Sequence, residues 1–383
     1  MIGGLLAIAL ALQFGQRAPL TAAETLLESV VVRAITDAPA DAMTGPAATI
    51  AGADAKAGTI ALTCRAGGCD AAAQAVRKLQ WLIGSKGMTP PARSIWIATA
   101  PNAVPPADTV AAIHVAGGDA PILRVVRGLW STASIGDEAA EVFARQDGAV
   151  EVRAFESLGQ PRLDSQGVAT TTIVTNPANT PQAASAAAAT AYFLATLPNA
   201  GAEALLAHLI VGAHARLAED GRRAVALMGN QQRASADVLI MFGQAIEREQ
   251  RRMRSLERFM PAPVDPMLQI RLTEMEKGIT SVWTSMGITS SPFVPPAERI
   301  RGRGGDDRRV PSRTAGATGS AEASVLKVAN SQEVAYEIVN FIDGKRTISD
   351  IRDAVMAEFG AVQLPAVVQY LEALAKAGAI SIK

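Results

Sequence analysis

Strand-like and helix-like segments alternate over the first half of the chain, and this alternation limits the fold more than any other feature. Short β-branched or apolar runs predict strands, whereas apolar residues spaced three and four apart predict helices. The predicted strands are residues 28–35, 59–63, 94–99, 109–115, 150–155 and 170–174, and the predicted helices are residues 69–84, 137–145 and 183–197. This order is typical of a mostly parallel sheet with flanking helices, so we predict an α/β protein.

The pattern then changes, and two long helices are predicted over residues 202–226 and 232–259. A further helix is predicted over residues 267–286, so that residues 199–289 form a helical extension. The second long helix ends in the charged run E-R-E-Q-R-R-M-R-S-L-E-R, residues 247–258. Runs of mixed charge are usually the solvated face of a helix with i,i+4 ion pairs. We therefore expect this run to face solvent rather than to form a binding patch.

Residues 290–322 have the composition of a linker, because proline, glycine and arginine are frequent there. The piece R-G-R-G-G at residues 301–305 is similar to the arginine–glycine segments that bind RNA. Asp306 and Asp307 follow directly and offset its positive charge, so a solvated linker is the preferred interpretation.

Residues 323–383 are predicted to form a small C-terminal domain of three helices and a terminal strand, which is similar to a winged helix. Thr347 and Asp350 have the spacing of a capping box, and Gly360 has the position of a C-cap. Residues 325–383 carry six basic side chains against seven acidic ones, and the whole chain carries 36 of each. No nucleic-acid partner is therefore expected.

The N-terminus indicates export. Residues 3–14 are an apolar run about as long as the core of a signal peptide, and too short to span a bilayer as a helix. Residues 1–23 are therefore interpreted as a signal peptide or as an apolar segment that packs on the body or on a partner. The expected location is the periplasm, the cell surface or the extracellular space, with no membrane span in the mature chain.

Residues 175–182 read T-N-P-A-N-T-P-Q and resemble a zinc-ligand segment, H-T-P-A-D-T-P-D, of the di-zinc aminopeptidases of metallopeptidase family 28. Residues 340–360 and 364–378 resemble a C-terminal module attached to exported bacterial members of that family. The resemblance implies a zinc-exopeptidase-like α/β domain over residues 24–198. Family members hold two zinc ions with two histidines and several carboxylates, and a Glu acts as general base.

Carried over position by position, the resemblance implies that most of the metal site is missing. Cys64 or Arg65 stands at the first histidine of the family's motif. Asp70 matches the bridging aspartate and is retained. Ala103 and Val104 stand at the paired glutamates, one of which is the general base and the other a ligand.

The later motifs show the same loss. Ala116 stands at the next ligand aspartate, and Thr175 stands at the last histidine. Asn179 and Gln182 replace the acids that follow it. One remaining carboxylate cannot hold two zinc ions, so no catalytic residue, metal or cofactor is expected.

The remaining histidines do not suggest other chemistry. His208 and His214 are six residues apart on one predicted helix, about 600° of rotation, and so lie on different faces. His114 lies among apolar residues of a predicted strand, where a core histidine is the simplest interpretation. Cys64 and Cys69 are the only cysteines, and in an oxidising compartment they could form a disulfide, although two reduced cysteines remain an alternative.

These observations predict an exported, catalytically inactive aminopeptidase-like protein that acts as a structural or interaction subunit. Protein partners or self-assembly are expected. An active zinc exopeptidase with ligands at other positions, which would need zinc as its cofactor, and a peptide-binding protein that does not cleave remain the alternatives.

Overall fold

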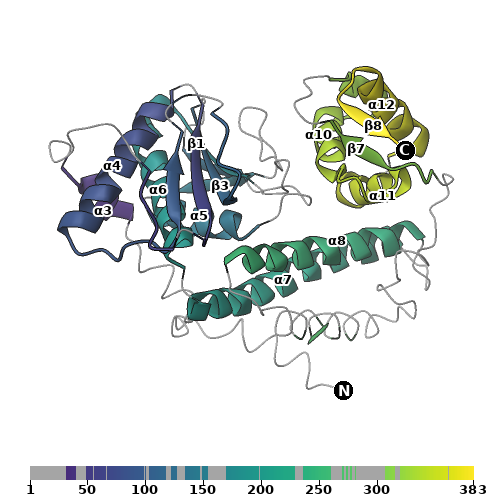
Figure 1. Ribbon diagram of the computed structural model, residues 1–383. Helices are drawn as coiled ribbons and strands as arrows, with labels where there is room; N and C mark the ends of the chain where they lie inside the picture. Colours follow the sequence, from purple (N-terminus) through teal and green to yellow (C-terminus); the bar gives the residue numbers. More distant parts are fainter. Residues whose placement is uncertain are drawn as a thin grey trace.

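The computed structural model describes an α/β domain, a long helical hairpin and a C-terminal domain (Figure 1). The described residues are 32–39, 49–54, 56–65, 67–98, 100, 103–117, 122–126, 134–146, 149–153, 170–197, 199–228, 236–259, 270, 273–274, 277, 281, 307–314, 320–360 and 362–383. The segment interpreted as a signal peptide, residues 1–23, and most of the predicted helix over residues 267–286 lie outside them.

A six-stranded sheet forms the centre of the α/β domain. Its strands are β1 (Thr59–Cys64), β2 (Ser94–Ile97), β3 (Thr109–Gly117), β4 (Leu123–Val126), β5 (Val150–Arg153) and β6 (Thr170–Thr175). Their order across the sheet is β2-β1-β3-β6-β4-β5. β2, β1, β3 and β6 are parallel, whereas β4 runs antiparallel to β6 and parallel to β5. The sheet is mostly parallel and flanked by helices, which confirms the predicted α/β fold class.

Four helices lie on one face of this sheet, namely α3 (Val32–Asp37), α4 (Cys69–Ser85), α5 (Ile135–Gln146) and α6 (Thr180–Thr196). α6 contacts the other three helices and four of the strands, and nearly all of its side chains are buried. Alanine dominates α6, so neighbouring helices and strands can approach its backbone closely on every side. An alanine helix also loses no side-chain entropy on folding.

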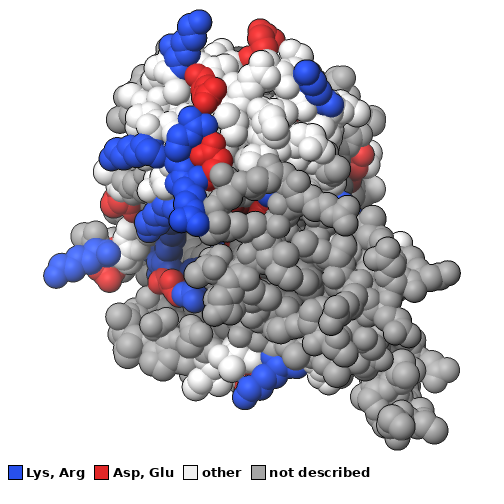
Figure 2. Space-filling model, turned by 90° about the vertical axis from the view of Figure 1, so that its right-hand side faces the viewer, with Lys and Arg blue, Asp and Glu red and all other residues white. Residues whose placement is uncertain are grey.

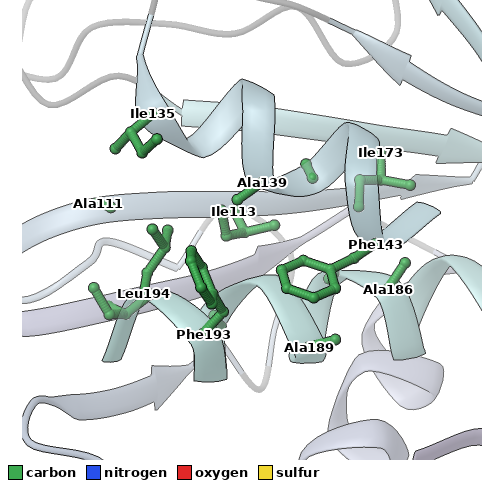
Figure 3. Close-up of a cluster of buried hydrophobic side chains, with 14 of the residues drawn as sticks. Ala111, Ile113, Ile135, Ala139, Phe143, Ile173, Ala186, Ala189, Phe193 and Leu194 are labelled. Carbon is green, nitrogen blue, oxygen red and sulfur yellow. The ribbon is translucent and has the colours of Figure 1, made fainter. Parts of the chain in front are cut away.

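Large side chains fill the space beside this alanine helix (Figure 3). The rings of Phe143 on α5 and Phe193 on α6 lie 5.5 Å apart at an interplanar angle of 58°. Ile113 of β3 and Ile173 of β6 are fully buried and belong to the same core. This tilted aromatic pair therefore holds α5 and α6 together over the middle of the sheet.

Two local predictions in this domain were wrong or incomplete. Helix α3, residues 32–37, overlaps the second half of the strand predicted over residues 28–35. Val32 and Ile35 are one helical turn apart and are both fully buried against the core, so tertiary packing overrides their preference for strands. Strand β4 was not predicted, because its four residues, L-R-V-V, carry no alternating pattern.

The helical hairpin consists of α7 (Asn199–Met228) and α8 (Ala236–Arg254), followed by the 3₁₀ helix η3 (Ser255–Phe259). The expectation that the charged run of α8 faces solvent is wrong for its central residues. Arg248, Glu249 and Arg252 are only 8%, 0% and 3% exposed. They lie between α7, α8 and α5, where they pair with one another and with charges on the other two helices.

The C-terminal domain contains the three predicted helices, α10 (Ser331–Phe341), α11 (Ile348–Phe359) and α12 (Leu364–Lys376). The predicted capping box is confirmed: the Thr347 hydroxyl accepts from the Asp350 N–H, and the Asp350 carboxylate accepts from the Thr347 N–H. Gly360 ends α11 with a φ of 92°, a conformation that favours glycine. Whether this domain acts as a winged helix stays a prediction.

The C-terminal domain begins earlier than predicted. β7 (Pro311–Arg313) pairs antiparallel with β8 (Ile380–Ile382), although residues 290–322 were assigned to a linker. The Arg309 carbonyl also accepts from the Ile348 N–H at 2.9 Å, which attaches this segment to the start of α11. A three-residue strand that starts with proline has no sequence signature of its own and becomes visible only beside its partner.

α8 packs against α11, so the hairpin contacts the C-terminal domain as well as the α/β domain (Figure 1). Arg251 of α8 lies over the Phe341 ring, 5.7 Å from its centroid, and Arg346 lies over the same ring at 5.4 Å.

In the described part of the chain, no single helix is long and apolar enough to cross a membrane; α11 and α12 would pass that test only as a pair bent by 117°.

Candidate functional site

The carboxyl ends of β1, β2, β3 and β6 lie along one edge of the sheet, because these four strands are parallel. The chain leaves β1 through α4 to β2 on one side, and then returns to β3 on the other side of β1. The strand order therefore reverses between β1 and β3, and open α/β sheets commonly bind ligands at the carboxyl ends of the strands at such a position. Most of the residues singled out from the sequence lie along this edge.

Three of these residues surround the end of β1. Cys64 is the last residue of β1 and is 2% exposed, whereas Arg65 follows it and is exposed. Asp70 lies in the first turn of α4 and is also exposed. The Arg65 N–H donates to the Val115 carbonyl of β3 at 3.0 Å, so this loop rests on the neighbouring strand.

Ala116, Thr175 and Asn179 follow on β3 and β6. Ala116 is fully buried near the end of β3, and Thr175, the last residue of β6, pairs with Gly117. Asn179 lies in the short 3₁₀ helix η2 (Pro177–Asn179), and its N–H donates to the Asn176 side chain at 2.9 Å. Ala116 and Thr175 thus lie at the carboxyl ends of two neighbouring strands, and Asn179 directly precedes α6.

Ala103 and Val104 lie in the loop between β2 and β3. Ala103 is half-buried and packs against the main core, whereas Val104 is 85% exposed. Gln182 is exposed near the start of α6.

The side chains at these positions do not fit a di-zinc site. Alanine and valine offer no metal ligand, and Cys64 and Cys69 are joined in a disulfide with a Cα–Cα distance of 5.0 Å. Asp70 offers the one carboxylate among them. Across the described residues, no three His, Cys, Asp or Glu side chains lie together in a way that could hold a metal ion.

A row of polar residues crosses the second face of the sheet, away from α6. The Thr63 hydroxyl of β1 lies 2.9 Å from Nδ1 of His114 on β3, and His114 is opposite Thr172 of β6. The Thr172 hydroxyl is buried, and among the described residues it has no hydrogen-bond partner. His114 thus has a hydroxyl partner, as expected of a satisfied histidine, but it is half-buried rather than a core residue.

The described residues include a cluster of charges that the sequence did not predict, which we call the hairpin network. It consists of Asp137 and Glu138 on α5, Arg216 and Asp220 on α7, and Arg248, Glu249 and Arg252 on α8. Arg216 donates to Glu138 at 2.9 Å and to Glu249 at 2.8 Å, and Arg252 donates to Glu138. Arg248 donates to Asp220 at 2.9 Å.

Burial and ion pairing have opposite effects on the pKa values of the carboxyl groups in this network. Burial alone would raise the pKa of Glu249, but hydrogen bonds from Arg216 and the charges of Arg248 and Arg252 outweigh it and lower that pKa. Burial raises the pKa of Asp137 to about 6, against the opposing effects of Arg252 and the hydrogen bonds from Thr171 and Ser134. The network joins three helices through charges that have been taken out of water.

One signal in the sequence could have indicated this network. Ala245, Glu249, Arg252 and Leu256 follow the spacing of one helix face, and Val238 begins the same stripe. Two charges on an otherwise apolar stripe indicate a buried pair rather than a solvated face.

Several charges of the C-terminal domain lie on the surface, unlike the buried charges of the hairpin network. Figure 2 shows a column of basic side chains with acidic side chains between them. Arg309 pairs with Asp307 at 2.7 Å and with Glu372 at 2.9 Å, and Arg346 pairs with Asp343 at 2.5 Å. These arginines are held in local ion pairs, which reduces the field that a polyanion would meet.

Comparison of the chain with models of protein families, with curated proteins and with solved structures found no match. The resemblance to metallopeptidase family 28 therefore rests on the sequence motifs alone.

Proposed function

We propose that this chain is an exported, catalytically inactive aminopeptidase-like protein that serves as a structural or interaction subunit of an extracellular or cell-envelope assembly. The observation that carries the proposal is the set of side chains at the carboxyl edge of the sheet. Cys64, Ala116 and Thr175 stand at the ends of three parallel strands, where a hydrolase of this type would need imidazoles and carboxylates.

The disulfide supports the export part of the proposal. Disulfides persist in oxidising compartments and are rare in the cytosol. Cys64 and Cys69, the only two cysteines of the chain, are joined to one another. The chain therefore suits an environment outside the cytoplasm, as residues 1–23 also predict.

The hairpin supports the interaction part of the proposal. α7 and α8 are joined to α5 by buried ion pairs, and α8 also packs against α11 of the C-terminal domain. Arg93 at the start of β2 adds a further attachment, since its Nη2 donates to the Phe259 carbonyl at 2.7 Å. The hairpin thus links the α/β domain to the small C-terminal domain, which is the part that we propose contacts a partner.

The direct test uses full-length protein purified without chelators. Metal content is measured by mass spectrometry, and hydrolysis of a panel of aminoacyl-nitroanilides is measured with and without added zinc. We expect neither bound zinc in stoichiometric amount nor turnover. Stoichiometric zinc together with turnover would overturn the proposal in favour of an active exopeptidase.

The subunit role is tested separately by size-exclusion chromatography with light scattering, on protein from the native source. A mass above that of one chain, 39.7 kDa for the full sequence, is expected. A monomer at every concentration, with no co-purifying protein, contradicts an assembly role.

A further inference from the structure

The Cys64–Cys69 disulfide presents its two sulfurs unequally. Cys64 ends β1, is 2% exposed, and its Sγ lies 3.7 Å from the Ala98 carbonyl oxygen in the core. Cys69 is the first residue of α4 and is half-buried. Of the two sulfurs, Sγ of Cys69 is therefore the one that lies nearer to solvent and is open to an external thiol.

The loop between the two cysteines is held by backbone contacts as well as by the disulfide. The Arg65 N–H donates to the Val115 carbonyl at 3.0 Å, and the Gly68 N–H donates to the Arg65 carbonyl at 2.9 Å. Gly68 also packs closely on β3, because a Cβ at this position would lie 3.0 Å from the Val115 oxygen. After reduction, these contacts would keep the two sulfurs near one another.

The start of α4 favours a negative charge on the sulfur of Cys69. α4 has 17 residues, and its N-cap, Gly68, has no side chain to satisfy the first N–H groups. Unsatisfied N–H groups and the helix dipole stabilise an anion at this end of a helix, and thiolates at helix N-termini are the reactive form of cysteine. Asp70 is exposed to solvent, which screens its opposing charge.

The disulfide also closes a small ring, since the cysteines are five residues apart. By loop entropy, so short a closure stabilises the fold less than a long closure would. Its reduction therefore does not have to unfold the domain.

We propose that Cys64 and Cys69 form a thiol–disulfide exchange site, open at Cys69, that reacts with low-molecular-weight thiols such as glutathione. A thiolate of the reductant attacks Sγ of Cys69, and a mixed disulfide forms at that sulfur. The Cys64–Cys69 bond breaks, and Cys64 leaves as a thiolate that takes a proton from solvent.

A second thiolate then attacks the external sulfur of the mixed disulfide. Cys69 leaves as the thiolate and the two external thiols become a disulfide, so that two electrons pass to the protein. The reverse sequence, with oxidised glutathione as the oxidant, restores the Cys64–Cys69 bond. This activity is independent of the proposed subunit role and needs neither zinc nor peptide hydrolysis.

The first experiment treats natively purified full-length protein with reduced and then with oxidised glutathione. Samples are acid-quenched, alkylated and weighed as intact protein. We expect complete, reversible conversion between disulfide and dithiol, with circular dichroism unchanged. Reduction that occurs only in denaturant, reduction that removes the native circular dichroism, or failure of oxidised glutathione to restore the bond would each overturn the proposal.

The second experiment compares Cys64→Ser with Cys69→Ser, a matched pair because each lacks the disulfide and keeps one thiol. Oxidised glutathione is added at pH 7, and formation of the mixed disulfide is followed by intact mass. Because exposure and thiolate stabilisation both favour Cys69, we expect Cys64→Ser to react at least about 10-fold faster. Equal rates, or faster reaction of Cys69→Ser, contradict Cys69 as the open sulfur.

Discussion

Arg216 on α7 donates hydrogen bonds to the carboxylate of Glu249 on α8 through two of its nitrogens. Nε lies 3.1 Å from both oxygens, and Nη2 lies 2.8 Å from Oε2. The Glu249 side chain is fully buried, so this contact replaces its hydration. The same arginine donates to Glu138 on α5, and one guanidinium thus connects the hairpin to the α/β domain. Loss of either partner would leave a buried charge without compensation.

Replacement of Glu249 is therefore expected to destabilise the protein strongly. Glu249→Ala should lower the free energy of unfolding by about 3–5 kcal/mol, because Arg216 and Arg248 would keep their charges in a poorly hydrated place. Urea unfolding followed by circular dichroism measures the change. Glu219→Gln is the matched control, since Glu219 pairs with Arg222 on the exposed side of α7, where ion pairs contribute little. A loss below about 1 kcal/mol for Glu249→Ala would contradict a structural role for the network.

The buried carboxyl of Asp137 should make stability depend on pH. Its folded pKa of about 6 lies above the ordinary value of 3.8, so the folded protein binds this proton more tightly than the unfolded chain. The stabilisation from this proton is complete below about pH 4 and is lost as the pH rises through about 6. The loss of this proton should lower the free energy of unfolding by at most about 3 kcal/mol in total.

Asp137→Asn tests this dependence, because an amide retains the acceptor for the Ser134 N–H and can donate to the Thr171 hydroxyl. From pH 4 to pH 8, the wild-type chain should lose stability relative to this variant. The measurement is urea unfolding at closely spaced pH values. Parallel pH profiles for the two chains would show that Asp137 does not titrate in this range.

The aromatic pair over the sheet predicts a large core effect. Phe193→Ala should cost about 3–5 kcal/mol, because it opens a cavity against Phe143 and removes the ring contact. Val211→Ala on α7 is a suitable comparison, since Val211 is 71% exposed and its loss should change stability by less than about 0.5 kcal/mol. Thermal and urea unfolding measure the stability of both variants. A similar loss of unfolding free energy for the two would contradict the placement of Phe193 in the core.

The capping box of α11 predicts a smaller, local effect. Thr347→Ala should cost about 1 kcal/mol, since the Asp350 N–H loses its acceptor at the start of the helix. Hydrogen exchange should show the loss in the first turn of α11 and not in α6. Ser381→Ala on the exposed side of β8 serves as the neutral comparison. No change in either stability or exchange after Thr347→Ala would mean that the cap contributes nothing to α11.

The sequence alone determined the elements whose signals are local. β1, β3 and β6 follow from short β-branched runs, α4 from its apolar stripe, and the capping box of α11 from the spacing of Thr347 and Asp350. Such signals lie within one or two turns of chain, so a single sequence contains them in full. The mostly parallel sheet followed from their order.

Only the tertiary structure decided which local preferences prevail. Val32 and Ile35 lie in a helix because their buried face meets α6, and β7 exists because β8 lies beside it. Glu249 is buried because Arg216, more than 30 residues earlier in the chain, faces it across the hairpin. The free energy of a buried charge depends on a partner brought close by folding, and no pattern of neighbours along the chain specifies that partner.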